Sequence, residues 1–446
     1  MFRIMAQKVN LQALARVRCQ RFRGLRRIIR APRLTNNPGM KSGYKGAIEP
    51  VWEVNSVMKK SPKNSGQRER RPVWRSFVSY LLAVILTLLA LPPGDFVASV
   101  PQTRSEGHLA LSEPLTLRWQ YTTDSTINLT PATDGQRIYL PLAAGTLVSL
   151  RTTDGQMLWR TETGGELSAS PAADDRGVYI ASETGVVQGT APRATGALRA
   201  LGRESGVTLW MHTLPFPLRG ALAMNEQTLF GGAADGRLYA VNKKSGEVAW
   251  INQFSTSFSS IPAVSDSHLL IGNDDGTLIC LDQATGKQLW RYRTHGAVRG
   301  RPALHRGMVY FGSADGYVYA LEETTGRFRW RTRTGAGVQA VTVTDGGLLV
   351  ASLDNFVYFL SLTHGARLWK RQLAGRIAAQ PLAGADSALF TPLSADAGVV
   401  LDLRDGKQLN TIPVGEDNTT AASPIVVADV LFVTTRQGLL AFSRPG

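Results

Sequence analysis

Tryptophan recurs at a nearly constant interval from residue 119 onward. Successive tryptophans are 40, 51, 40, 40, 40 and 39 residues apart, and the residue 41 positions after the last one is Asn410. The seven positions are Trp119, Trp159, Trp210, Trp250, Trp290, Trp330 and Trp369. A period of about 40 residues predicts a repeat protein in which each unit packs against its neighbours.

Two turn signals divide each unit into short, alternating apolar runs. The first is Asp-Gly, as at Asp235-Gly236 and Asp275-Gly276, with the variant Asp354-Asn355; the second is a small polar residue before glycine, as at Ser245-Gly246. Gly and Asn tolerate the positive φ that tight hairpins require, and an aspartate at such a turn caps its own backbone. Apolar runs separated by hairpin turns predict four antiparallel strands per unit.

Unit openings give the number of units and predict how the chain closes. Most units open with a proline before a short apolar run, whereas Ala221 and Ala340 replace it in the third and sixth units. Counting these openings gives eight units, and the last has only three strand candidates before the chain ends. We expect the segment 115–121, which carries Trp119, to supply the fourth strand and so remove an exposed sheet edge. The predicted fold is an all-β, eight-bladed β-propeller over residues 113–445.

The tryptophans have a structural interpretation. Burying 150 to 250 Å² of an indole contributes about 4 to 6 kcal/mol of gross hydrophobic stabilisation. Once per unit, this is enough to dock each blade onto the next. About 11 extra residues near 186–196 form an insertion in the second unit, and such insertions often belong to a binding surface.

The repeated order Asp-Gly, Leu-Tyr-Ala-Val/Leu, Thr/Ser-Gly and Trp resembles the pyrroloquinoline-quinone (PQQ) repeat of quinoprotein dehydrogenase-like propellers. Eight minimal units are most similar to the BamB family of propellers in the outer-membrane protein assembly machinery. That resemblance implies a non-enzymatic partner-binding scaffold at the cell envelope. Members of the BamB family are typically lipoproteins, but no cysteine occurs here between Phe77 and Ile279.

The PQQ-repeat resemblance also leaves two alternatives open: a PQQ-dependent dehydrogenase that uses calcium, and an extracytoplasmic ligand-binding or sensor propeller. Quinoprotein enzymes typically carry two adjacent cysteines and large insertions around the cofactor. Cys280 stands alone in a position that other units fill with alanine, which indicates a core residue. The six histidines show no metal-ligand spacing. We therefore expect no catalytic, cofactor or metal residues, and no cofactor.

The basic charge of the chain is confined to its N-terminal end. Residues 1–76 hold 19 Lys and Arg against 3 acids, a net charge of +16, whereas residues 77–446 hold 31 of each sign. Residues 1–76 are predicted to be a largely disordered leader. Met58 is a candidate start site, which would leave 57 residues untranslated. With a neutral body and no recognition fold, nucleic acid is not an expected partner.

An apolar run, residues 77–91, follows the leader. As a helix it would span about 22 Å, less than the roughly 30 Å hydrocarbon core, so it predicts the core of a signal peptide or a signal-anchor helix. Residues 92–112 are the expected linker. The propeller is therefore expected to be exported and monomeric, either periplasmic after cleavage or held at the inner membrane by residues 77–91.

One group of residues suggests partner binding. Arginines directly follow two tryptophans, recur two residues later, and precede one blade opening, at Arg291, Arg293, Arg299, Arg301, Arg331 and Arg333. They are solvated surface charges or a basic sector across blades four to six. Because arginine is favoured at interfaces, a basic sector would dock an acidic protein partner.

Overall fold

The structure is a computed structural model, and it describes residues 109–188 and 191–445. The predicted leader, the apolar segment 77–91 and most of the linker lie outside these residues. The packed region begins before residue 113, the expected start of the propeller. Leu109 and Leu111, which we placed in the linker, are buried among residues of the last two strand groups. In the part of the chain that is described, no helix has the length and apolar character needed to cross a bilayer.

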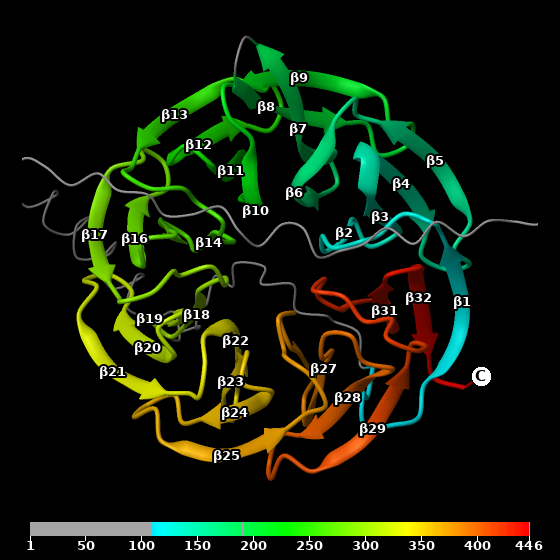
Figure 1. The fold of residues 1–446 in the computed structure, drawn as a ribbon, viewed down its shortest axis with the longest axis vertical. Coiled ribbons are helices and arrows are strands. Elements are labelled where there is room, and N and C mark those ends of the chain that lie inside the picture. Colours follow the sequence, from blue (N-terminus) through cyan, green and yellow to red (C-terminus); the bar gives the residue numbers. More distant parts are fainter. Residues whose placement is uncertain (1–108, 189–190, 446) are drawn as a thin grey trace, which may run out of the picture. The chain divides into compact units, whose positions relative to one another are not determined.

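The described residues form 32 strands and one short 3-10 turn, which confirms the all-β prediction. The strands assemble in groups of four, called blades here, and Figure 1 shows the blades side by side in a ring. Blade 1 contains β2 (Ala132–Thr133), β3 (Arg137–Leu142), β4 (Thr146–Arg151) and β5 (Met157–Glu162), with η1 (Ala143–Gly145) between β3 and β4. Blade 2 contains β6 (Glu166–Ala173), β7 (Val178–Gln188), β8 (Ala191–Leu201) and β9 (Thr208–Leu214). Blade 3 contains β10 (Leu218–Met224), β11 (Thr228–Ala233), β12 (Arg237–Asn242) and β13 (Val248–Gln253).

The remaining blades follow in chain order. Blade 4 contains β14 (Ala263–Val264), β15 (His268–Gly272), β16 (Thr277–Asp282) and β17 (Gln288–Arg293). Blade 5 contains β18 (Ala303–His305), β19 (Met308–Gly312), β20 (Tyr317–Glu322) and β21 (Phe328–Arg333). Blade 6 contains β22 (Val338–Thr344), β23 (Gly347–Ser352), β24 (Phe356–Leu360) and β25 (Arg367–Gln372). Blade 7 contains β26 (Leu382–Ala383), β27 (Ser387–Phe390), β28 (Ala397–Asp402) and β29 (Gln408–Pro413).

Blade 8 joins the two ends of the described chain. It contains β30 (Ile425–Val427), β31 (Val430–Thr435) and β32 (Gly438–Ser443), and β1 (Thr116–Thr122) completes it. β1 is antiparallel to β32, with Thr116 opposite Ser443 and Thr122 opposite Gly438. Figure 1 shows β1 in cyan beside β32 in red. Within each blade the first strand in chain order lies innermost and the last lies on the rim, except that β1 takes the rim position of blade 8.

Blades 2 and 3 differ from the predicted separate antiparallel blades. Their strands form one eight-stranded sheet, because β6 and β10 pair in parallel at Ser170 and Ala221. The two paired strands are long, since β6 has eight residues and β10 has seven, whereas the innermost strand β14 has two.

The apolar core lies between blades rather than within them. In the described residues, each of the eight buried clusters joins two successive blades. One of these clusters packs Phe432 and Leu439 of blade 8 against Ile138 and Leu150 of blade 1. Since a four-stranded blade cannot bury both faces alone, this mutual burial holds the ring together.

Both predicted turns adopt the expected backbone. At the first turn φ is +89° for Gly276 and +67° for Asn355, and the Asp275 carboxylate accepts a hydrogen bond from the Thr277 N–H at 3.1 Å.

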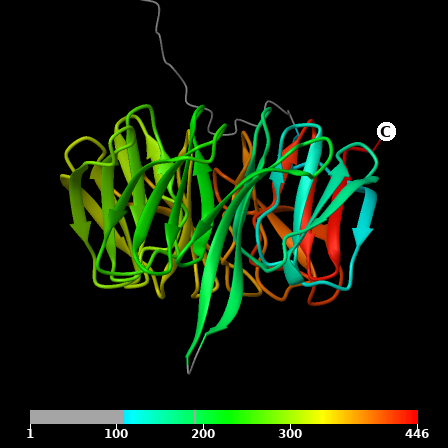
Figure 2. The ribbon, with the colours of Figure 1, turned by 90° about the horizontal axis from the view of Figure 1, so that it is seen from above.

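The insertion of blade 2 lengthens β7 and β8 into a hairpin, which Figure 2 shows projecting beyond the other loops on its side of the ring. A two-pronged ion pair between Glu183 of β7 and Arg219 of β10 ties this hairpin to blade 3.

Candidate interaction surface and the junctions between blades

Each of the seven tryptophans reaches from its own blade to the next. The indole Nε1–H of Trp210, for example, donates to the carbonyl oxygen of Lys243 in blade 3 at 2.8 Å, and the other six form the equivalent bond at 2.7 to 3.1 Å. At each of these seven junctions the acceptor lies seven residues before the next tryptophan position, or before Asn410 in blade 7. In the eighth position, the Asn410 side chain donates to the carbonyl oxygen of Glu113 at 2.7 Å. The same junction is thus made with a smaller side chain.

The glycine of the second turn also packs against the tryptophan of the preceding blade, which the sequence did not reveal. A β-carbon at Gly246 would lie 2.7 Å from two atoms of the Trp210 indole, and one at Gly286 would lie 2.6 Å from Trp250. The indole therefore lies flat on the glycine of the next blade. Its other neighbours include an aromatic ring of its own blade, as in Phe230 and Trp250, whose ring centroids are 6.0 Å apart. Sequence alone explained this glycine only by its φ, because the spacing pattern does not show what covers the turn.

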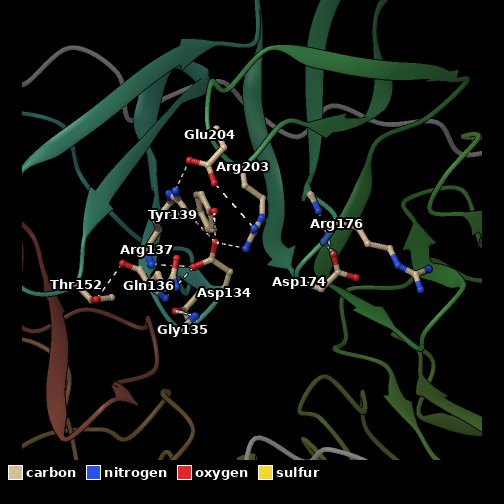
Figure 3. A network of polar contacts seen from close by, with 12 residues as sticks. Asp134, Gly135, Gln136, Arg137, Tyr139, Thr152, Asp174, Arg176, Arg203 and Glu204 are labelled. Carbon is tan, nitrogen blue, oxygen red and sulfur yellow. Dashed lines mark hydrogen bonds and ion pairs between the residues drawn. The ribbon is translucent and has the colours of Figure 1, made fainter.

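A buried carboxylate joins blades 1 and 2 (Figure 3). The side chain of Asp134, after β2, is fully buried; its Oδ2 accepts hydrogen bonds from the Tyr139 hydroxyl at 2.8 Å and from Arg203 of blade 2 at 3.2 Å. Arg137 donates to the same oxygen at 3.3 Å and also pairs with Glu204 of blade 2. Arg203 thus serves the junction twice, since its carbonyl oxygen accepts the indole hydrogen bond of Trp159.

The surroundings of Asp134 shift two pKa values. Burial alone would raise the pKa of the Asp134 carboxyl, but hydrogen bonds from Tyr139 and from the backbone of Gln136 and Arg137 outweigh it, so the pKa is lowered. Desolvation, followed by the hydrogen bond to Asp134, raises the pKa of Tyr139. Asp134 therefore stays ionised at neutral pH inside the junction.

The residue that receives the indole also carries a different polar contact at each of the next three junctions. Lys243 pairs with Asp174 at 2.5 Å, Gln283 accepts from Asn225 at 2.9 Å, and Glu323 accepts from Ser265 at 2.7 Å and contacts His268 at 2.9 Å. The repeated sequence pattern did not indicate these contacts. The sequence did contain a signal for these contacts. The position seven residues before the tryptophan varies in charge from Arg203 to Glu323, although the turn beside it repeats from blade to blade.

Replacing Asp134 with asparagine should lower the free energy of unfolding by about 2 kcal/mol at pH 7, since two arginines lose their buried partner. The folded pKa of Asp134 lies below the unfolded value of about 3.9, so its contribution is complete above that pH. It disappears as pH falls through the lower folded pKa. Urea titrations from pH 3 to 8 measure this dependence.

The control for Asp134→Asn is Asp154→Asn, which removes an exposed carboxylate paired with the exposed Arg151. This control should lose far less stability than Asp134→Asn, because its partners are exposed to solvent. A loss for Asp134→Asn that stayed constant down to pH 3 would contradict the assigned role of the carboxylate.

Four of the six predicted docking arginines come together on the rim. Arg291 and Arg293 on β17, and Arg331 and Arg333 on β21, are all exposed on the outermost strands of two adjacent blades (Figure 1). The two strands touch through the stacked rings of Tyr292 and Phe328, whose centroids are 6.3 Å apart. The structure thus forms a basic band across blades 4 and 5.

The other two predicted arginines are placed differently. Arg299 is paired, because its Nε donates to Asp274 at 3.0 Å. Arg301 precedes β18, the innermost strand of blade 5, and is solvent-accessible, yet the protein around it lowers the pKa of its guanidinium by desolvation. Neither belongs to the rim band, because both lie on the connection that runs inward from β17 to β18.

A metal site needs several ligating atoms in one place. Calcium takes six to eight oxygen ligands, and among residues 109–188 and 191–445 no three carboxylate, imidazole or thiol side chains gather to hold a metal. Cys280 is buried, and desolvation raises the pKa of its thiol to about 12, so the reactive thiolate is disfavoured. The other cysteine, Cys19, lies outside the described residues.

Comparison with known proteins places this architecture in a family. The family described as outer membrane protein assembly factor BamB matches residues 66–220, 143–255, 194–298, 234–331 and 297–445, which together cover most of the chain. The chain belongs to this family. The resemblance of the repeated motif to the PQQ repeat is therefore confirmed.

Individual known proteins match this chain at low sequence identity. BamB from Shewanella oneidensis is 29% identical over 104 residues, a match that spans 22% of this chain and 24% of that relative. The crystal structure of BamB from Moraxella catarrhalis has a TM-score of 0.62 and 17% identity over 74% of this chain and 97% of its own. The quinohemoprotein alcohol dehydrogenase from Comamonas testosteroni has a TM-score of 0.61 and 12% identity, covering 74% and 77% of the two chains. These two structures are similar in fold.

Proposed function

We propose that the chain is a non-enzymatic interaction scaffold that takes part in outer-membrane protein assembly on the extracytoplasmic side of the cell envelope. The observation that carries this proposal is the BamB family match across residues 66–445. The scaffold would be a rigid, closed ring of eight blades, with β1 as the last strand of blade 8. The cluster shared by blades 8 and 1 and the pairing of β1 with β32 support that closure.

The docking surface of this scaffold is the basic band of Arg291, Arg293, Arg331 and Arg333, and its partner is an acidic protein. Four exposed guanidiniums on two abutting strands raise the local positive potential, which steers and orients an acidic surface. Arg331 also lies over the Tyr317 ring at 4.7 Å, which limits its freedom before a partner binds.

Charge reversal tests this function. The double variant Arg291→Glu, Arg331→Glu should reduce the yield of barrel-assembly components that co-purify with the protein from envelope extracts at least tenfold. The control, Arg160→Glu, makes the same change at the equivalent position of blade 1, where Arg160 already lies 3.5 Å from Glu162, and should leave the yield unchanged. Equal yields from all three proteins would contradict the docking surface.

Two results would contradict the scaffold function itself. One is the absence of barrel-assembly components from the wild-type capture. The other is a bound-quinone absorbance, with alcohol or sugar oxidation, after addition of PQQ and calcium.

A further inference from the structure

The rim of the ring consists of sheet edges. In the described residues β1, β5, β9, β13, β17, β21, β25 and β29 each end their own run of paired strands. Each carries a β-bulge just before its tryptophan position, or before Asn410 in β29, so the bulge does not distinguish the blades. An edge strand offers a row of backbone N–H and C=O groups to any other strand, and proteins usually protect it with charge or proline.

The protection differs sharply around the ring. Directly after the tryptophan position, the residues in blades 8, 1, 2, 3, 4, 5, 6 and 7 are Gln120, Arg160, Met211, Ile251, Arg291, Arg331, Lys370 and Thr411. Three residues after it they are Thr122, Glu162, Thr213, Gln253, Arg293, Arg333, Gln372 and Pro413. Blades 1, 4, 5 and 6 thus carry charge, and blade 7 carries a proline that lacks the N–H.

The edge of blade 2 has neither form of protection. Val207, Leu209 and Met211, on and just before β9, are 62%, 61% and 53% exposed, the largest such group on one edge of the described chain. The run 207–218 contains no Asp, Glu, Lys or Arg. Blade 3 exposes Ile251 as well, but its edge has a single apolar side chain of this kind and ends in Gln253, whose amide binds the carbonyl oxygens of Asp235 and Phe254.

We propose that the edge of β9 accepts an extended, uncharged strand of a partner polypeptide, with apolar residues at alternate positions. The backbone row of an edge strand is satisfied by another strand, and an exposed apolar side chain on that edge selects an apolar neighbour across the new pair. The rim's charge pattern selects the same occupant, because an acidic segment is drawn to the basic band of blades 4 and 5, whereas β9 offers no charge. This inference rests on the proposed scaffold function and adds a second docking surface to it.

The test uses the full chain and a defined probe. The probe is a fluorescent nine-residue peptide of alternating threonine and valine, N-methylated on alternate residues so that only one of its edges can pair. Fluorescence anisotropy measures its affinity, and hydrogen exchange locates its site. We expect binding to slow amide exchange in residues 208–214 and in no other rim strand.

Two variants copy protection that the chain uses elsewhere, so both should fold. Met211→Arg reproduces the residue at positions 160, 291 and 331, and Thr213→Pro reproduces Pro413, whose pairing with Ala397 matches that of Thr213 with Ala197. Each should weaken peptide binding at least tenfold. The control is Thr411→Arg, which adds the same charge at the matching position of the already protected blade 7 and should leave binding unchanged.

The remaining outcomes overturn the proposal. The first is that the peptide does not slow amide exchange in β9, and the second is that Met211→Arg binds the peptide as well as the wild-type protein does. The third is that protection of β9 grows with protein concentration in the absence of peptide, which would indicate a second copy of this chain as the occupant. If barrel-assembly components still co-purify with the wild-type protein in that case, the β9 proposal fails while the scaffold function stands. If those components do not co-purify but β9 binds the peptide, the scaffold function fails instead.

Discussion

Replacing Gly246 with alanine is expected to lower the free energy of unfolding by about 2 to 5 kcal/mol. The positive φ of +74° accounts for about 1 to 2 kcal/mol, since an L side chain is strained there. Overpacking accounts for a further 1 to 3 kcal/mol, because the new β-carbon would lie 2.7 Å from the Trp210 indole. Urea unfolding of the two proteins measures the difference.

Gly307→Ala separates the two causes of the Gly246 effect. Gly307 has nearly the same φ, +72°, and an added β-carbon there would meet nothing within 4 Å. This control should lose only the 1 to 2 kcal/mol of backbone strain. If both variants lost the same stability, the indole contact would have no energetic role and the second turn would require glycine for its backbone alone.

Replacing Trp210 with alanine should cost about 3 to 5 kcal/mol, the usual loss for deleting a large aromatic side chain from a core. The change removes the packing between blades 2 and 3 and leaves the Lys243 carbonyl without its 2.8 Å hydrogen bond. At the junction of blades 7 and 8, Asn410→Ala should cost only about 1 kcal/mol, since a single small amide provides that contact. The same urea titrations apply.

A double-mutant cycle joins these two predictions. In the Trp210→Ala protein the neighbouring ring is gone, so Gly246→Ala should then cost no more than Gly307→Ala. The coupling energy between positions 210 and 246 is expected to be about 1 to 3 kcal/mol. Additive losses would mean that the two residues act separately.

The repeat made most of the fold predictable from sequence. The blades and their hairpins could be predicted from the tryptophan spacing and the two glycine turns, because every unit repeats the same local pattern. The parallel pair that merges blades 2 and 3 was not foreseen, since it depends on how two inner strands approach each other.

The polar junctions were not predictable from the local pattern. Asp134 and Arg203 are 69 residues apart in sequence and meet because successive blades stack. Likewise, sequence grouped Arg299 and Arg301 with the rim arginines, but their side chains lie on the connection from β17 to β18, where Arg299 is paired with Asp274. Sequence revealed charge and period, whereas three-dimensional contact decided which charges remain exposed.

Closure of the ring by β1 is the central claim, and disulfide mapping tests it most directly. In a Cys19→Ser background, cysteines at Thr116 and Ser443, which are opposite each other in β1 and β32, should form an intramolecular disulfide on mild oxidation. Cysteines at Thr122 and Ser443, at opposite ends of the pair, should not. A disulfide in the second variant but not the first, or in neither, would contradict the antiparallel closure of blade 8.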